Sequence, residues 1–176
     1  MSGREKLIEE TRILESLHPS LTREEIMRIS DKDISGYVFS KFDEFPPNER
    51  VVARLLEKNL RVKLRHFPKV DSPQAISSPD FAIPEWGYLV EIKEPSTARR
   101  GIEAAIRKAI RQILAIQCNL EKGIIVVCLD SITDAAVQES KEMAICRAMN
   151  LGVQNLIVIY KCKIIHESIK NKTTVR

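Results

Sequence analysis

The sequence predicts an α/β domain in which a mixed central sheet is flanked by helices. After residue 47, a stretch with helical spacing of apolar residues gives way to short stretches that alternate or are almost wholly apolar, as strands do. Two later stretches, IIVVCL and NLIVIY, suit strands that are buried on both faces. Three strands are predicted before helices and strands begin to alternate, so antiparallel and parallel pairs are expected within one sheet.

The predicted order after residue 47 is α-β-β-β-α-β-α-β. Helices are predicted over residues 48–58, 99–118 and 133–152. Strands are predicted over residues 61–66, 80–83, 88–93, 124–129 and 155–160. The first helix is expected to close near Asn59, a residue that tolerates the left-handed conformation, and the last is expected to be capped by Thr133.

Residues 1–45 predict a small helical arm that precedes the main domain, residues 46–176. An amphipathic stretch over 4–17 is followed by a capping box, Thr22 with Glu25, that starts a second short helix. The arm carries 7 basic and 10 acidic residues, and this balance argues against a DNA-reading helix-turn-helix. A lid, or an arm through which two copies form a homodimer, is the preferred interpretation.

The composition is that of an ordinary soluble globular protein, with 44% hydrophobic and 30% charged residues among 176. The charged N-terminal residues do not resemble a signal peptide, and no apolar run has the length of a membrane span. The expected location is therefore the cytoplasm, with no membrane partner. The four cysteines form no CxxC pair and are expected to be reduced thiols in the core.

Basic residues gather in the main domain, which holds 21 of them against 14 acidic residues. Five lie in the predicted helix 99–118: Arg99, Arg100, Arg107, Lys108 and Arg111. A polyanion such as a nucleic acid is the partner that this charge favours. The same row of bases would also be produced by the solvated side of an amphipathic helix.

Asp80, Glu91 and Lys93 form the pattern that points most directly to a catalytic site. Glu91 and Lys93 share one face of the predicted strand 88–93, and a hairpin would bring Asp80 opposite them. Two carboxylates suit a hard divalent cation such as Mg²⁺. A neighbouring lysine can offset the charge that develops on a phosphate, so the set suits metal-assisted phosphodiester cleavage.

"PD" at 79–80 followed by "EIK" at 91–93 resembles the PD-(D/E)xK nuclease superfamily, which has a restriction-endonuclease-like αβββαβ core. The resemblance implies an endonuclease with Mg²⁺ or Mn²⁺ bound by Asp80, Glu91 and the backbone carbonyl of Ile92, and with Lys93 as the catalytic lysine. It further implies an acid on the preceding helix, matched by Glu49, and a Gln or basic residue on the following helix, matched by Gln112 or its neighbours.

Within the superfamily, the segment "EIKEPSTARRGIEAAIRKAIRQ" is most similar to the C-terminal tRNase domains of contact-dependent growth inhibition toxins. That similarity implies RNA such as tRNA as substrate, while the superfamily at large leaves DNA equally open. The five bases of the helix and Gln112 would then contact the nucleic acid.

Each residue of the pattern has a plainer interpretation. Glu91 and Lys93 could be a solvated strand face with a weak surface ion pair, and Asp80 could belong to a Pro-Asp turn. Glu49 could be an acid that favours the first turn of a helix. A nucleic-acid-binding module without catalysis and a protein-interaction or scaffold domain are therefore the alternative functions.

Overall fold

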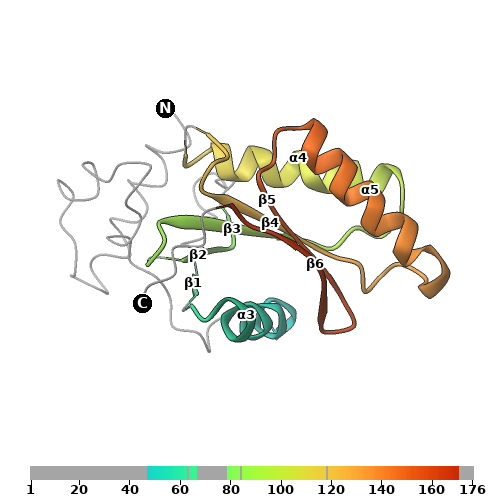
Figure 1. Cartoon of the computed structure of the whole chain (residues 1–176), viewed down its shortest axis with the longest axis horizontal. Coiled ribbons are helices and arrows are strands. Elements are labelled where there is room, and N and C mark those ends of the chain that lie inside the picture. The colour runs from blue at the N-terminus through green and yellow to red at the C-terminus, as the bar shows by residue number, and fades with distance from the viewer. Residues whose placement is uncertain (1–46, 63, 67–78, 84, 118, 171–176) are drawn as a thin grey trace, which may run out of the picture.

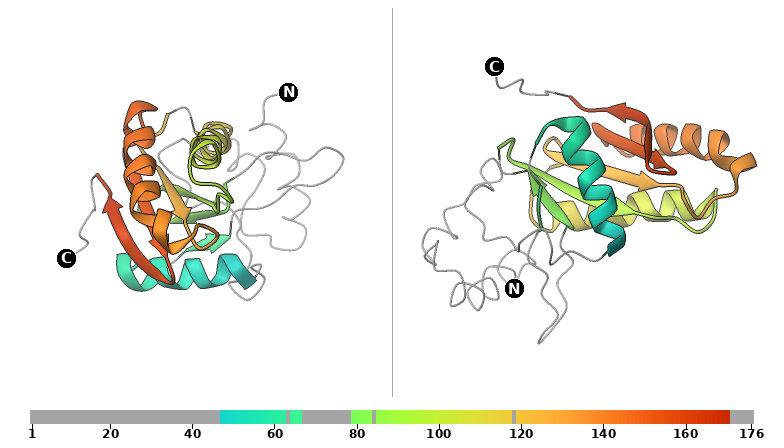
Figure 2. Two further views of the ribbon diagram at one scale, coloured as in Figure 1. Left: turned by 90° about the vertical axis from the view of Figure 1, so that its right-hand side faces the viewer. Right: turned by 90° about the horizontal axis from the view of Figure 1, so that it is seen from below.

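The computed structural model describes residues 47–62, 64–66, 79–83, 85–117 and 119–170, which form three layers (Figure 1). Helix α3 (Pro47–Leu60) covers one face of a six-stranded sheet. Helices α4 (Arg100–Leu114) and α5 (Val137–Asn150) cover the other face, as the two turned views in Figure 2 show. The predicted α/β architecture, a mixed sheet flanked by helices, is confirmed.

The strands lie side by side in the order in which they occur in the chain. They are β1 (Arg65–His66), β2 (Phe81–Ile83), β3 (Tyr88–Lys93), β4 (Gly123–Cys128), β5 (Asn155–Tyr160) and β6 (Lys163–Ser168). The first three strands pair antiparallel, β3, β4 and β5 pair parallel, and β6 pairs antiparallel with β5. Helices α4 and α5 make the two parallel crossovers, so the C-terminal ends of β3, β4 and β5 meet at one edge.

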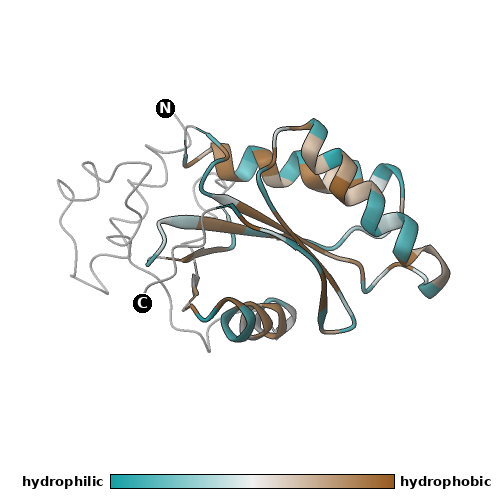
Figure 3. Ribbon diagram, in the orientation of Figure 1, coloured by the Kyte–Doolittle hydropathy of each residue, from teal (hydrophilic) through white to brown (hydrophobic). Residues whose placement is uncertain are grey.

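Alternation along the strands builds two separate cores. Val90 and Val126 pack towards α3, whereas Ile125 and Val127 pack towards α4 and α5. Figure 3 shows the central strands hydrophobic along their length, which agrees with their burial on both faces. The isoleucines of α4 form the buried stripe that their spacing predicts.

The segment after α3 differs from its prediction. The strand predicted over 61–66 is reduced to β1, because the N–H of Leu64 donates to Glu57 Oε1 of α3 at 2.9 Å instead of joining a strand. The left-handed residue is Arg61, with φ 55°, and not Asn59. Asn59 lies inside the helix and its side-chain amide donates to the Leu55 carbonyl at 2.7 Å.

The two later helices also differ at their ends. Helix α4 stops at Leu114, before the predicted residue 118, and Ala115 caps it through its backbone N–H. Residues Asp134–Ala136 form a short 3₁₀ turn, labelled η2, before α5 begins. Thr133 stands at the start of that turn, but its side chain makes no capping hydrogen bond.

Strand β6 was not predicted, because its hairpin has no glycine or asparagine. Lys161 and Cys162 both take positive φ, 46° and 57°, in the two-residue turn between β5 and β6. Such turns favour Asn-Gly. Here the N–H of Lys161 donates to Asp130 Oδ1 at 2.7 Å, a contact that holds the turn from outside the hairpin.

Some predictions from the sequence concern residues that the structure does not describe, and the prediction for the cysteines is partly wrong. The helical arm over 1–45 and its proposed homodimer contact lie outside the described residues, as does Cys118. Cys128 is buried as predicted, but Cys146 and Cys162 are exposed free thiols and not core residues. Of the helices that the structure describes, none has the length and apolar character to cross a membrane.

Gly123, at the start of β4, is required by the close approach of α4. A Cβ at this position would lie 2.8 Å from Cγ2 and 3.0 Å from Cδ1 of Ile113. We expect Gly123→Ala to lower the free energy of unfolding by about 1–3 kcal/mol through overpacking, measured by urea denaturation. An unchanged urea midpoint would show that α4 does not press on β4 as described.

Candidate active site

The β2–β3 hairpin brings Asp80 against Glu91. Phe81 pairs with Val90, so the residue before β2 lies beside the carboxylate of Glu91. The N–H of Asp80 donates to Glu91 Oε2 at 3.0 Å, and the N–H of Ile92 donates to Asp80 Oδ2 at 2.9 Å. Each acid is thus held by the backbone of the strand opposite.

Lys93 completes this group. Its Nζ forms an ion pair with Glu91 Oε1. The Glu91 side chain is 0% exposed and that of Lys93 is 16% exposed. A solvated strand face with a weak surface pair is therefore the wrong interpretation of these two residues. Asp80 is also buried, and its contact with Ile92 crosses to the neighbouring strand.

A pocket of about 450 Å³ opens next to this group, between the start of α3 and the C-terminal ends of β3 and β4. Its lining residues are Glu49, Val51, Val52, Asp80, Ile92, Lys93, Glu94, Cys128 and Asp130. Three of the four predicted catalytic residues, Glu49, Asp80 and Lys93, therefore face one cavity. The fourth, Glu91, is not among the lining residues and contacts two that are, Asp80 and Lys93.

Burial makes Glu91 an unusual acid. The pKa of the Glu91 carboxyl is raised from its ordinary value of 4.5 to about 8, first by burial and second by the nearby Asp80 carboxylate. The Lys93 ammonium and the N–H of Asp80 act in the opposite direction. The net effect is a raised pKa.

Two further acids of the pocket were missed in the sequence. Glu94 directly follows β3, and Asp130 follows the end of β4 by two residues. The C-terminal ends of parallel strands are where α/β proteins commonly bind their ligands. Glu94 Oε1 accepts from the Ser131 hydroxyl at 2.7 Å, and Asp130 Oδ1 accepts from the N–H of Lys161 at 2.7 Å. In the sequence, these two acids could have been recognised by their position just after two predicted strands.

Cys128 lines the same pocket but is not suited to act as a nucleophile. The pKa of its thiol is raised to about 12, mainly by burial; a hydrogen bond with the Asp130 backbone lowers it, and the carboxylates of Asp130 and Glu94 raise it. A thiol with so high a pKa stays protonated at neutral pH. We therefore assign it to the wall of the pocket.

The predicted nucleic-acid contacts lie away from the pocket. Helix α4 runs back along the sheet from the end of β3, so Gln112 stands about 18 Å along the helix from Arg100. All five basic residues predicted to contact nucleic acid are exposed. Arg99 and Arg100 are the two that lie nearest in the chain to the end of β3. The described lining of the pocket includes neither Gln112 nor any of these five residues.

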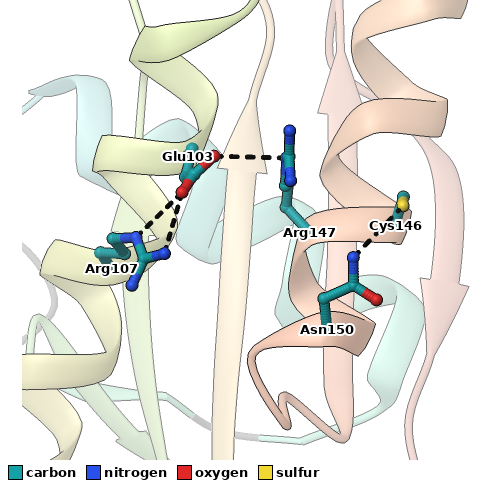
Figure 4. A network of polar contacts seen from close by, with 5 residues as sticks. All are labelled: Glu103, Arg107, Cys146, Arg147 and Asn150. Atoms are coloured by element: carbon teal, nitrogen blue, oxygen red, sulfur yellow. Dashed lines mark hydrogen bonds and ion pairs between the residues drawn. The ribbon is translucent and has the colours of Figure 1, made fainter.

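Acidic partners occupy part of the basic row. Arg107 donates to Glu103 Oε1 at 2.9 Å, and Arg147 of α5 approaches Glu103 Oε2 at 3.3 Å (Figure 4). Arg99 lies 3.5 Å from Glu139. The Arg107–Glu103 pair lies within α4, whereas the Arg147–Glu103 and Arg99–Glu139 pairs reach α5. Such exposed pairs are individually weak, so the arginines remain available to a stronger anion.

The donor set at the hairpin fits a hard divalent cation. Mg²⁺ is commonly held by one or two carboxylates and keeps several waters, and two neighbouring carboxylates are present in Asp80 and Glu91. Within the described ranges, no cluster of three or more His, Cys, Asp or Glu side chains has metal-binding geometry. Two carboxylates would leave the other coordination positions of such an ion to water.

Comparison of the chain with protein-family models, with curated proteins and with solved structures finds no match.

Glu91 should make stability depend on pH. Because its pKa is raised in the folded state, its contribution is fully present below about pH 4.5 and is lost as the pH rises to about 8. We expect the free energy of unfolding in EDTA to fall by a few kcal/mol over this window, at about 1.4 kcal/mol per pKa unit. Glu91→Gln should largely abolish the fall, measured by urea denaturation at several pH values.

The exposed neighbour Glu94 provides the control. Glu94→Gln removes one carboxylate from the same strand end and should keep the pH dependence of the wild type. An equal dependence in Glu91→Gln and the wild type would contradict the assigned burial of Glu91.

Proposed function

We propose that this protein is a metal-dependent endonuclease that hydrolyses phosphodiester bonds in nucleic acid. One observation carries the proposal: Asp80 and Lys93 both line one pocket, and both are hydrogen-bonded to the buried Glu91. Burying a carboxylate is costly, so a simple surface ion pair would not be expected to contain a buried carboxylate with a second acid and a cavity beside it. The likeness to PD-(D/E)xK nucleases gives the same residues the same roles.

The proposed roles follow from the chemistry of each group. Asp80 and Glu91 hold Mg²⁺ or Mn²⁺, with the backbone carbonyl of Ile92 as a further ligand. The bound ion supplies a Lewis acid and lowers the pKa of its water. Lys93 orients the attacking water and stabilises charge on the phosphate. Glu49, which reaches the same pocket from the first turn of α3, positions the ion or the lysine.

Nucleic-acid binding is proposed for the bases of α4 and the adjoining Arg99. Arg99 and Arg100 stand where the chain leaves β3, whereas Arg107, Lys108 and Arg111 continue along the exposed side of the helix. Such a row contacts phosphates and confers little sequence selectivity. We leave Gln112 out of the proposed contact, since it lies far along α4 and is half-buried.

One observation favours the alternative of a binding module without catalysis. Glu91 is completely buried and its Oε1 is taken by Lys93, so the arrangement is also compatible with a purely structural pair. The protein would then bind nucleic acid through α4 and leave it intact. Cleavage assays separate the two.

We expect DNA or RNA to be cleaved in Mg²⁺ and not in EDTA. Asp80→Asn, Glu91→Gln and Lys93→Ala should each reduce the cleavage rate by at least about 100-fold, since each removes a metal ligand or a transition-state charge. Lys58→Ala, at the other end of α3 from the pocket, is the matched control and should cleave as the wild type does. Binding without any cleavage would favour the alternative.

The α4 contacts predict a salt-dependent affinity. Replacing Arg107, Lys108 and Arg111 together by alanine should weaken binding across all sequences, because each lost phosphate contact removes about 0.9 from the slope of log K against log salt on duplex DNA. Filter binding at several salt concentrations measures the slope. A triple variant with the slope of the wild type would place the nucleic acid elsewhere on the molecule.

A further inference from the structure

The two oxygens of Glu91 are held by donors of different kinds. Oε2 accepts from the backbone N–H of Asp80 at 3.0 Å, and this donor is fixed by the pairing of β2 with β3. Oε1 contacts the ammonium of Lys93, which stands at the end of a flexible four-carbon side chain. Only the second contact can open without disturbing the hairpin.

Lys93 also contacts both Glu91 and the pocket. Glu91 is 0% exposed and is not part of the lining, whereas Lys93 is 16% exposed and lines the cavity. An ion in the pocket would therefore lie near the lysine whose ammonium contacts Oε1. Two cations at one oxygen repel each other strongly in so buried a place, where charge interactions are weakly screened.

We propose that Lys93 occupies the cation-binding oxygen of Glu91 in the metal-free protein and moves into the pocket when a divalent cation binds. This inference rests on the proposed function and adds a mode of regulation to it. The ammonium becomes available to a phosphate only after the cation has taken its place on Glu91. Binding of the cation thus precedes and prepares binding of the reacting phosphate.

The movement of Lys93 can be followed without any cleavage assay. The full chain is labelled with ¹³C at the lysine Cε, and the Lys93 signal is assigned by its absence from the Lys93→Arg variant. We expect Mg²⁺ to shift this signal with a saturable dependence on concentration. The signal of Lys108, an exposed residue on α4, is the internal control and should stay in place.

The Glu91→Gln variant tests the partner of the exchange. Without the carboxylate, the Lys93 signal of the metal-free variant should already be displaced from its wild-type position, and Mg²⁺ should not move it further. Calorimetry with Mg²⁺ on the same samples should show affinity at least about tenfold weaker than in the wild type, because a charged ligand is lost.

The outcomes separate this inference from the proposed function. If the wild type binds Mg²⁺ in calorimetry and the Lys93 signal does not move, the exchange is wrong while the metal-dependent nuclease stands. If the wild type neither binds Mg²⁺ nor cleaves nucleic acid, both proposals fall. A shift of the Lys93 signal that persists in Glu91→Gln would also overturn the exchange.

Discussion

The arrangement of the candidate site depends on two hydrogen bonds that cross from one strand to the next in opposite directions. The backbone of Asp80 binds the side chain of Glu91, and the backbone of Ile92 binds the side chain of Asp80. A hydrogen bond to a charged group contributes about 1.5–3 kcal/mol, and a buried acceptor left without a donor costs a comparable amount. Strands β2 and β3 are therefore fastened at the end where the pocket opens, beyond the last paired residues of the ladder.

Stability alone does not account for a carboxylate at position 91. Burial raises its pKa to about 8, so the fold carries a group whose charge it disfavours. A well-packed apolar side chain of similar size commonly stabilises a protein more than a buried ion pair does. Strand β3 is otherwise apolar over Tyr88–Val90, and its neighbours on β4 are apolar as well. The proposed function would give this acid a role in binding, which its effect on folding does not supply.

The sequence predicted the central hairpin because alternation and an intervening turn fix which residues of two short strands face each other. For the same reason Asp80, Glu91 and Lys93 could be grouped before their contacts were known. The burial of Glu91 behind Lys93 could not be predicted, since it depends on the helices that cover the sheet. Strand β6 was not predicted from the sequence, because the turn at Lys161 and Cys162 is stabilised by Asp130, a residue distant in the chain. The placement of Glu94 and Asp130 at one pocket likewise depended on the parallel pairing of β3 and β4.

Charge is distributed so that attraction and chemistry are separated. Among the described residues that line the pocket, Glu49, Asp80, Glu94 and Asp130 are acidic and Lys93 is the one base. The exposed bases of α4 lie outside it, on the helix that leaves the same strand end. A phosphate drawn to α4 would be repelled from the pocket unless a cation first offset those carboxylates. The same ion that supplies a Lewis acid would then also admit the substrate, so an acidic cavity is compatible with the proposed polyanionic substrate.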